Sequence, residues 1–234
     1  MTSATNATFW NALEERVSRF DLLQHPFYQA WSNGELTHAE LREYAAEYWH
    51  HVSAFPTYLS ALHSGMSDGE TRREVLRNLA EEEGVDTTLG RPHSDLWMDF
   101  AAAMGASRES VESRALQPET AALIAGFREL MQEKPVVAMA ALYAYESRVP
   151  AIARTKAEGL AAHYQTTGSG ARYFTLHETA DVHHASVWRG LISAQLAQQP
   201  DSAEAALNAA EQAAKALWTA LDGIERQRLQ QRAN

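Results

Sequence analysis

The 234-residue sequence contains no cysteine. This absence excludes disulfide bonds, cysteine nucleophiles and thiolate metal ligands, so any metal site must use nitrogen and oxygen donors. No apolar run approaches the roughly 18 residues of a membrane-spanning helix, and we expect no membrane partner. Basic residues are outnumbered by acidic ones, and the formal net charge of −10 argues against nucleic acid as a partner.

The sequence also lacks alternating strand patterns, and its breaks fall at stretches that contain glycine or proline. The helical period predicts helices over residues 7–20, 25–33, 37–65, 68–83, 94–104, 107–115, 118–133, 135–164, 171–198 and 201–230. Since neither an internal repeat nor a linker is present, we expect one all-α, single-domain helical bundle over residues 1–234. Its segment from about residue 201 should form a C-terminal helix with a solvated, frayed tail.

Local signals refine this prediction. Thr37 and Glu40 have the spacing of a helix capping box. Pro56 and Pro150 lie inside long predicted helices, where proline should introduce kinks. The N-terminal residues begin polar and become charged, unlike a secretory signal, so we expect a cytoplasmic protein.

Three polar side chains share one stripe of the predicted helix 171–198. At about 100° per residue, Asp181 lies about 40° from His177, and His184 lies about 20° on its other side. Trp188 and Leu191 are on the same face, so two imidazoles and a carboxylate point where apolar side chains belong. Unpaired buried charge is costly, and metal coordination is one way to relieve it. The stripe therefore predicts a metal site.

Glu146 is a second acid on an apolar face. Its neighbours within about 60° on the helical wheel are apolar, which places it at the centre of a core-facing stripe. A buried glutamate of this kind pairs either with a metal ion or with an arginine, and Arg148 and Arg154 are the available partners.

Further candidate ligands stand on either side of Gly84. Glu82 and Glu83 both border the apolar face of the predicted helix 68–83, and periodicity does not separate them, whereas Glu81 projects away and should be solvated. His93 follows a proline at the start of the next helix. It is a candidate metal ligand only if the other candidate ligands lie close to it in the fold.

Together these residues form a balanced ligand set. Three carboxylates and three neutral imidazoles would nearly neutralise two divalent cations and leave coordination positions open for water or dioxygen. Such donors suit iron or manganese and also accept zinc. The set comprises Glu82 or Glu83, with His93, Glu146, His177, Asp181 and His184.

The spacing of these residues resembles a known family. His-x-x-x-Asp-x-x-His, with a glutamate about thirty residues upstream, differs from the Glu-x-x-His pairs of ferritin-like bundles. It resembles the heme-oxygenase-like dimetal oxidases, and residues 25–64 are similar to the first helices of the wider TenA/PqqC-like group. The segments LRNLAEEEG, PHSDLW, ALYAYESRVPAIARTK and LHETADVHH resemble most closely the chlamydial protein associating with death domains (CADD) and its bacterial relatives. The likeness covers almost the whole chain.

The resemblance implies a heme-oxygenase-like fold and a specific cofactor. The metal-binding glutamate of that family stands two residues before a glycine, which selects Glu82 over Glu83. The implied cofactor is a pair of metal ions, Fe/Fe or Mn/Fe, with dioxygen and an external reductant as co-substrates. The sequence does not identify the electron donor. A homodimer is expected from the resemblance and from the frequency of twofold oligomers.

The resemblance also implies an activity. This subgroup makes para-aminobenzoate, a folate precursor, with a tyrosine of the protein as the ring source and a lysine as the amino donor. Carried over to this sequence, the tyrosine is Tyr28 in HPFYQ and the lysine is Lys156 in ESRVPAIARTK, while Tyr44 and Tyr145 match other tyrosines near the family's site. On the sequence alone, the alternative for Lys156 is a solvated surface lysine.

Three functions are compatible with these features. The first is a self-modifying dimetal oxidase that forms para-aminobenzoate, which the joint presence of Tyr28, Tyr145 and Lys156 favours. The second is an oxidase on the same scaffold that acts on an external small molecule, with these tyrosines as pocket lining. The third is a non-enzymatic interaction module, which would not require six converging ligands. A TenA-type thiaminase is disfavoured because the cysteine nucleophile is missing.

Overall fold

The computed structural model of the chain describes residues 3–67, 69–85 and 88–233, and in these ranges all regular structure is helical. The helices are α1 (Ser3–Ser18), α2 (Pro26–Ser32), α3 (His38–Ser64), α4 (Glu70–Glu82), α5 (His93–Ala103), α6 (Arg108–Glu112), α7 (Pro118–Leu130), α8 (Pro135–Glu146), α9 (Val149–His163), α10 (Arg172–Gln198) and α11 (Ala203–Ala233). Short 3-10 turns are η1 (Leu22–Gln24), η2 (Gly168–Ala171) and η3 (Pro200–Ser202). Over the described ranges, none of these helices combines the length and apolar character needed to cross a membrane.

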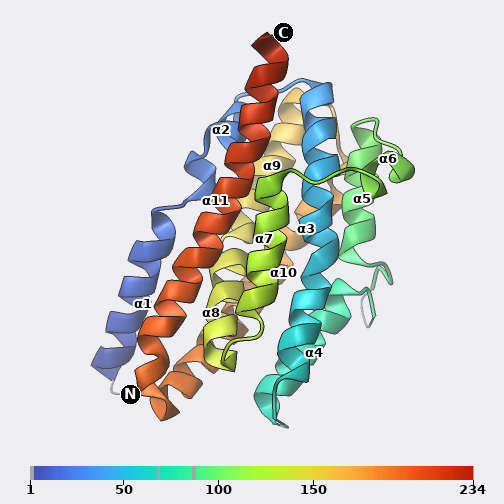
Figure 1. Cartoon of the computed structure of the whole chain (residues 1–234). Helices are drawn as coiled ribbons and strands as arrows, with labels where there is room; N and C mark the ends of the chain where they lie inside the picture. Colours follow the sequence, from blue (N-terminus) through green and yellow to red (C-terminus); the bar gives the residue numbers. More distant parts are fainter. Residues whose placement is uncertain (1–2, 68, 86–87, 234) are drawn as a thin grey trace.

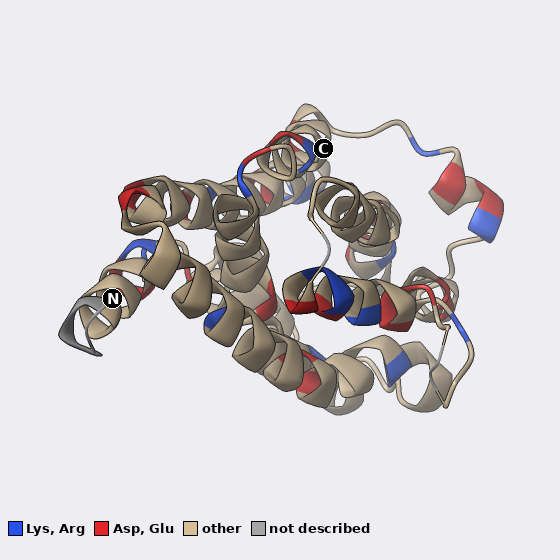
Figure 2. Cartoon of the chain, turned by 90° about the horizontal axis from the view of Figure 1, so that it is seen from below, with Lys and Arg blue, Asp and Glu red and all other residues tan. Residues whose placement is uncertain are grey.

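The long helices α3, α10 and α11 organise the bundle (Figure 1). α11 packs along α1, α7 and α8, α10 packs along α8 and α9, and α3 packs along α4, α5 and α7. The core between them is rich in aromatic side chains, and Trp31, Trp97 and Trp188 are almost fully buried. Acidic and basic residues are scattered along the helices without separation by sign (Figure 2). Since all regular structure in the described ranges is helical, the predicted all-α bundle is confirmed.

Two of the local predictions have different outcomes. The capping box at the start of α3 is confirmed, because the Glu40 backbone N–H donates to Thr37 Oγ1 at 3.2 Å and the Thr37 N–H donates to Glu40 Oε2 at 2.7 Å. The single helix predicted over residues 135–164 is wrong: α8 ends at Glu146, and α9 begins at Val149 with Pro150 in its first turn. Proline at this position starts a helix, since the missing N–H would have no partner there. α3, in contrast, continues through Pro56 as one helix.

The end of the chain also differs from the expected frayed tail. α11 remains helical to Ala233, although its last residues are exposed. Arg228 is buried and donates to Glu225, and Arg232 reaches back to α3, where its Nη2 donates to Glu40 Oε2 at 2.8 Å. The pair of Arg232 with Glu40 joins the last turns of α11 to α3, while the pair of Arg228 with Glu225 lies within α11 itself.

Gly159 marks a close approach between α9 and α2. A Cβ atom at this position would lie 2.7 Å from Trp31 Cδ1, and Trp31 also donates its indole N–H to the Lys156 carbonyl at 3.2 Å. We expect Gly159→Ala to lower the free energy of unfolding by about 1–3 kcal/mol, the usual cost of overpacking a core. Gly126→Ala, on α7, is the matched control because its Cβ would meet no atom within 4 Å. Urea unfolding of both variants measures the difference, and equal stability of Gly159→Ala and the wild type would contradict the packing argument.

Candidate functional site

Four helices bring the predicted ligands together inside the bundle. α4 supplies Glu82, α5 supplies His93, α8 supplies Glu146, and α10 supplies the remaining three. The six side chains form two buried groups, in each of which the potential ligand atoms lie within 4.8 Å of one another. The first triad is Glu82, His93 and His177, and the second triad is Glu146, Asp181 and His184.

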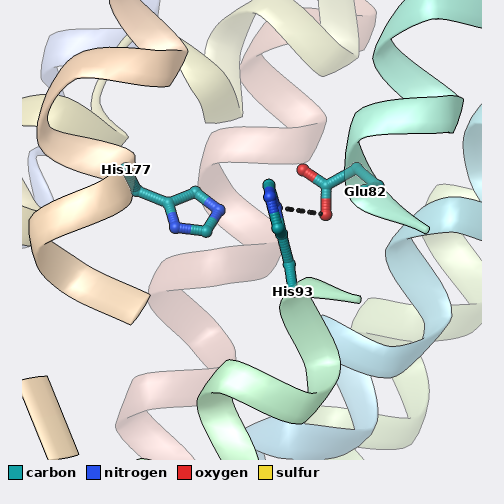
Figure 3. A group of neighbouring side chains, drawn as sticks. All are labelled: Glu82, His93 and His177. Atoms are coloured by element: carbon teal, nitrogen blue, oxygen red, sulfur yellow. Dashed lines mark ion pairs between the residues drawn. The ribbon is translucent and has the colours of Figure 1, made fainter. Parts of the chain in front are cut away.

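The first triad depends on a tight turn after α4. Gly84 has φ +71°, and a Cβ atom there would lie 2.2 Å from the backbone carbon of Arg91, so only glycine permits this approach of the chain to itself. The turn returns the chain so that His93, the first residue of α5, faces Glu82. His93 Nδ1 lies 3.0 Å from Glu82 Oε2, and the His177 ring stands on the other side of His93 (Figure 3).

The nitrogen atoms of the first triad are arranged to receive a ligand. His177 Nδ1–H donates to the Tyr173 carbonyl at 2.7 Å, which leaves Nε2 with a free lone pair. His93 Nδ1 is buried and faces Glu82 Oε2 at 3.0 Å. Burial opposes protonation of His93, but the Glu82 carboxylate outweighs it and raises the pKa of His93, so a cation between the two groups would replace a proton. The triad therefore fits a metal ion, and its donor types suit iron or manganese.

The second triad surrounds the carboxylate of Glu146. His184 Nδ1 lies 3.2 Å from Asp181 Oδ1 and 3.6 Å from Glu146 Oε2. Asn78 Nδ2 donates to both Glu146 oxygens at 3.2 and 3.3 Å, and Trp188 Nε1 donates to Oε2 at 2.9 Å. Glu146 is thereby held from two helices besides its own.

The arginine alternative for Glu146 is wrong. Arg148 pairs with Glu14 near the surface, and Arg154 donates to Glu178 at 3.0 Å. Both arginines are thus engaged elsewhere, and the neighbours of the Glu146 carboxylate are an amide, an indole and an imidazole.

The pKa values of Glu146 and His184 show that the second triad favours bound positive charge. Burial raises the pKa of Glu146 to about 8, and Asp181 and Glu82 add to this rise. Burial opposes protonation of His184, but Asp181, Glu146 and Glu81 outweigh it and raise its pKa to about 10. In the metal-free protein, protons therefore supply part of the positive charge that cations would supply. A divalent ion at this triad would replace them.

Lys156 lies in a separate aromatic pocket, so the alternative of a solvated surface lysine is wrong. Its side chain is buried, with 5% of its surface exposed, and Nζ donates to Tyr28 Oη at 2.8 Å and also to the hydroxyl of Tyr44. The two tyrosine hydroxyls lie 3.2 Å apart, and Nζ stands 4.2 Å from the centre of the Tyr28 ring. Burial lowers the pKa of Lys156 well below its ordinary value, and burial likewise raises the pKa of Tyr28.

Two tyrosines separate this pocket from the metal triads. Tyr145 and Tyr173 line a cavity of about 30 Å³ beside Tyr28 and Lys156. The same two tyrosines line a second cavity of about 10 Å³ with residues of both triads, among them Glu82. Tyr145 thus lines both the lysine pocket and the cavity at the candidate metal site, while Tyr44 contacts Tyr28 and Lys156.

Some residues at the site were missed by sequence reasoning. Glu81, which we expected to be solvated, has Oε2 2.8 Å from His184 Nε2. Asn78 was not identified at all, although it lies one helical turn before Glu82 on the same face of α4. Trp188 was recognised as core, but its hydrogen bond to Glu146 carries no sequence signal.

Comparison with known proteins defines the class of this chain. Solved structures with the same fold include a TenA homolog from Pseudomonas syringae, with a TM-score of 0.77, 20% identity and 93% of each chain covered. A CADD-like protein from Nostoc punctiforme has a TM-score of 0.73 and 17% identity over 94% of this chain and 98% of its own. A protein from Shewanella denitrificans described as having a heme oxygenase-like fold has a TM-score of 0.75 and 17% identity, with 96% of this chain and 90% of its own covered, so the predicted heme-oxygenase-like fold is confirmed.

The sequence comparisons identify the family. The profile of the iron-containing redox enzymes matches residues 42–218, and the chain belongs to that family. A protein named 4-aminobenzoate synthase from Nitrosomonas europaea is 40% identical, with 94% of this chain and 92% of the relative covered. Another of the same name, from Chlamydia trachomatis, is 38% identical, with 92% and 91% covered. The resemblance stated from the sequence is confirmed, and the protein is an enzyme.

Proposed function

We propose that this enzyme forms 4-aminobenzoate, with its own Tyr28 as the source of the ring and Lys156 as the amino donor, in an oxygen-dependent reaction at a dimetal centre. The observation that carries the proposal is the position of Lys156 Nζ, 2.8 Å from Tyr28 Oη and over the tyrosine ring. Relatives named 4-aminobenzoate synthase, 34–40% identical over more than 90% of this chain, support the same activity.

The geometry matches the bonds that such a reaction requires. In 4-aminobenzoate the amino group is para to the carboxylate, so a product derived from tyrosine carries nitrogen at the ring carbon that bore the hydroxyl. Lys156 Nζ lies beside that carbon, because it contacts the hydroxyl itself. The C–O bond of the phenol would break and its oxygen would leave as water. The carboxylate carbon would come from Tyr28 Cβ, which dioxygen would oxidise as the bond between Cβ and Cα breaks. The bond between Nζ and the lysine side chain would break as well.

The residues around Lys156 prepare it as a nucleophile. Among the described residues, its amino group has no carboxylate partner, and tyrosine hydroxyls and aromatic rings surround it. Because burial disfavours the ammonium form, the amine keeps a free electron pair. Tyr28 and Tyr44 hold this amine in place, and the buried setting keeps the Tyr28 phenol protonated.

The two triads would hold the metal ions, one ion each. When bound, iron or manganese ions with dioxygen and an external reductant supply the oxidising power that acid–base residues lack. His177 would bind through Nε2, since its Nδ1–H is engaged by the Tyr173 carbonyl. Asn78 and Trp188 would hold the Glu146 carboxylate in one orientation through their N–H donors.

A single-turnover experiment tests the proposal. Metal-free protein is prepared with ring-¹³C tyrosine, loaded with Fe(II) and Mn(II), and exposed to dioxygen and a reductant without any added substrate. We expect ¹³C-labelled 4-aminobenzoate, no more than one molecule per chain, and a matching loss of protein mass at Tyr28. Peptide mapping after proteolysis locates the loss.

The alternative is an oxidase of the same scaffold that acts on an external small molecule. Without an added substrate it predicts no labelled 4-aminobenzoate and an unchanged protein mass, and with its substrate it predicts several turnovers. Unlabelled 4-aminobenzoate would refute the self-modifying reaction. Labelled product formed undiminished by Tyr28→Phe would refute Tyr28 as the source of the ring.

A further inference from the structure

A carboxylate outside the candidate ligand set lies against the second triad. Glu81 Oε2 is 2.8 Å from His184 Nε2, with 41% of the Glu81 side chain and 5% of the His184 side chain exposed. Glu81 precedes Glu82, which belongs to the first triad, so the last turn of α4 reaches both groups. The contact between Glu81 and His184 therefore joins α4 to α10 beside the candidate metal site.

The two nitrogen atoms of the His184 ring face different partners. Nδ1 is directed at the triad, since it lies 3.2 Å from Asp181 Oδ1 and 3.6 Å from Glu146 Oε2. Nε2 is directed at Glu81. In the metal-free protein each ring nitrogen has a carboxylate acceptor, Asp181 at Nδ1 and Glu81 at Nε2. An ion at the second triad would take the place of the proton on Nδ1, and Glu81 would then accept the one N–H that the neutral ring keeps, on Nε2.

His177 shows how the ring of another candidate ligand is held. Its Nδ1–H donates to the carbonyl of Tyr173, one turn earlier on α10, so its orientation is fixed within its own helix. His184, in contrast, takes its outer partner from α4. A cavity of about 40 Å³ between the two helices is lined by Asn78, Glu81 and His184, and the partly exposed Glu81 stands at its edge.

We propose that Glu81 is a positioning residue for metal binding. By accepting a hydrogen bond from His184 Nε2–H, it fixes the ring with Nδ1 toward the second triad and makes that nitrogen the ligand atom. The inference rests on the proposed dimetal function. It assigns a role to a residue that would not touch the metal ion, the substrate tyrosine or the lysine.

Metal binding by matched variants tests this role. Glu81→Ala removes the acceptor, and Glu81→Gln keeps an acceptor oxygen but removes the charge. Glu83→Ala is the control, because Glu83 carries the same charge two residues further on and is exposed. Stepwise titration of the metal-free proteins with Mn(II) should show that Glu81→Ala weakens one of two binding steps by about 10–100-fold, the usual effect of losing such a partner. The other step and Glu83→Ala should match the wild type, and Glu81→Gln should lose less than Glu81→Ala.

The ligand atom gives a second, independent readout. In zinc-loaded wild-type protein, ¹⁵N spectra of the imidazoles should show His184 coordinated through Nδ1 and protonated on Nε2. Coordination through Nε2, or two unchanged Mn(II) steps in Glu81→Ala, would overturn the role of Glu81. A wild-type protein that binds fewer than two ions would instead contradict the dimetal function, so the two failures are distinguishable.

Discussion

Lys156→Met is expected to abolish release of 4-aminobenzoate and, at the same time, to make the fold more stable. The loss of product follows because methionine has no nitrogen to transfer, while it fills nearly the same space in the aromatic pocket. Tyr28 and Tyr44 keep each other as hydrogen-bond partners, since their hydroxyls lie 3.2 Å apart. Lys156 is not a member of either metal triad, so metal content should stay unchanged.

The gain in stability comes from the cost of burying an amine. Each unit by which burial lowers the pKa of an amine corresponds to a cost of about 1.4 kcal/mol at a pH below both pKa values, and an apolar side chain of similar volume avoids this cost. The pKa of Lys156 is lowered in the folded protein, so the unfolded chain binds the proton more tightly. The cost of burial therefore grows as the pH falls from about 10.4 toward the folded-state pKa. The stability difference between Lys156→Met and the wild type should be larger at pH 7 than at pH 10.

Three measurements check this expectation. Product is quantified after one exposure to dioxygen, metal content is determined, and the free energy of unfolding is measured at both pH values. Lys215→Met is the control, because Lys215 is an exposed lysine on α11. It should release product like the wild type and show no pH-dependent difference in stability. Undiminished product from Lys156→Met would show that the nitrogen comes from elsewhere.

The residues that share one helix were accessible from the sequence. His177, Asp181 and His184 follow from the helical period alone, because angles around a single regular helix add. Tyr28 and Lys156 were a different case, since they lie on separate helices and were identified by resemblance. The helical period does not relate the direction of Lys156 to that of Glu146, because a helix break at Ser147 and Arg148 separates them.

The contact between Glu81 and His184 was not accessible in the same way. Glu81 lies off the apolar face of α4, and on an isolated helix such a residue is solvated. Its partner belongs to α10, about a hundred residues later, and no periodicity encodes which helix approaches that side. The helical end of α11 also depends on such a contact, because Arg232 donates to Glu40 on α3. Long-range ion pairs of this kind depend on how the helices pack.

Glu146→Ala is expected to lower the metal content from two ions per chain to about one. Without Glu146, the second triad keeps only Asp181 and His184, which are too few protein ligands for a tightly held ion. The first triad does not include Glu146 and should keep its ion. Release of 4-aminobenzoate should stop, because the oxidising centre would be incomplete.

The pH dependence of metal binding tests whether the lost ion is the one bound at the second triad. With a pKa of about 8 for Glu146 and about 10 for His184, both groups hold protons in the metal-free wild type at pH 6, and an ion must displace them. Binding to the second triad should therefore strengthen from pH 6 to pH 8 and release protons, as calorimetry in buffers of different ionisation enthalpy would detect. Glu146→Ala should lose this binding step, while Glu158→Ala, an exposed glutamate on α9, should retain it. If Glu146→Ala still bound two ions, the second ion would not depend on the second triad, because this variant leaves only Asp181 and His184 of that triad.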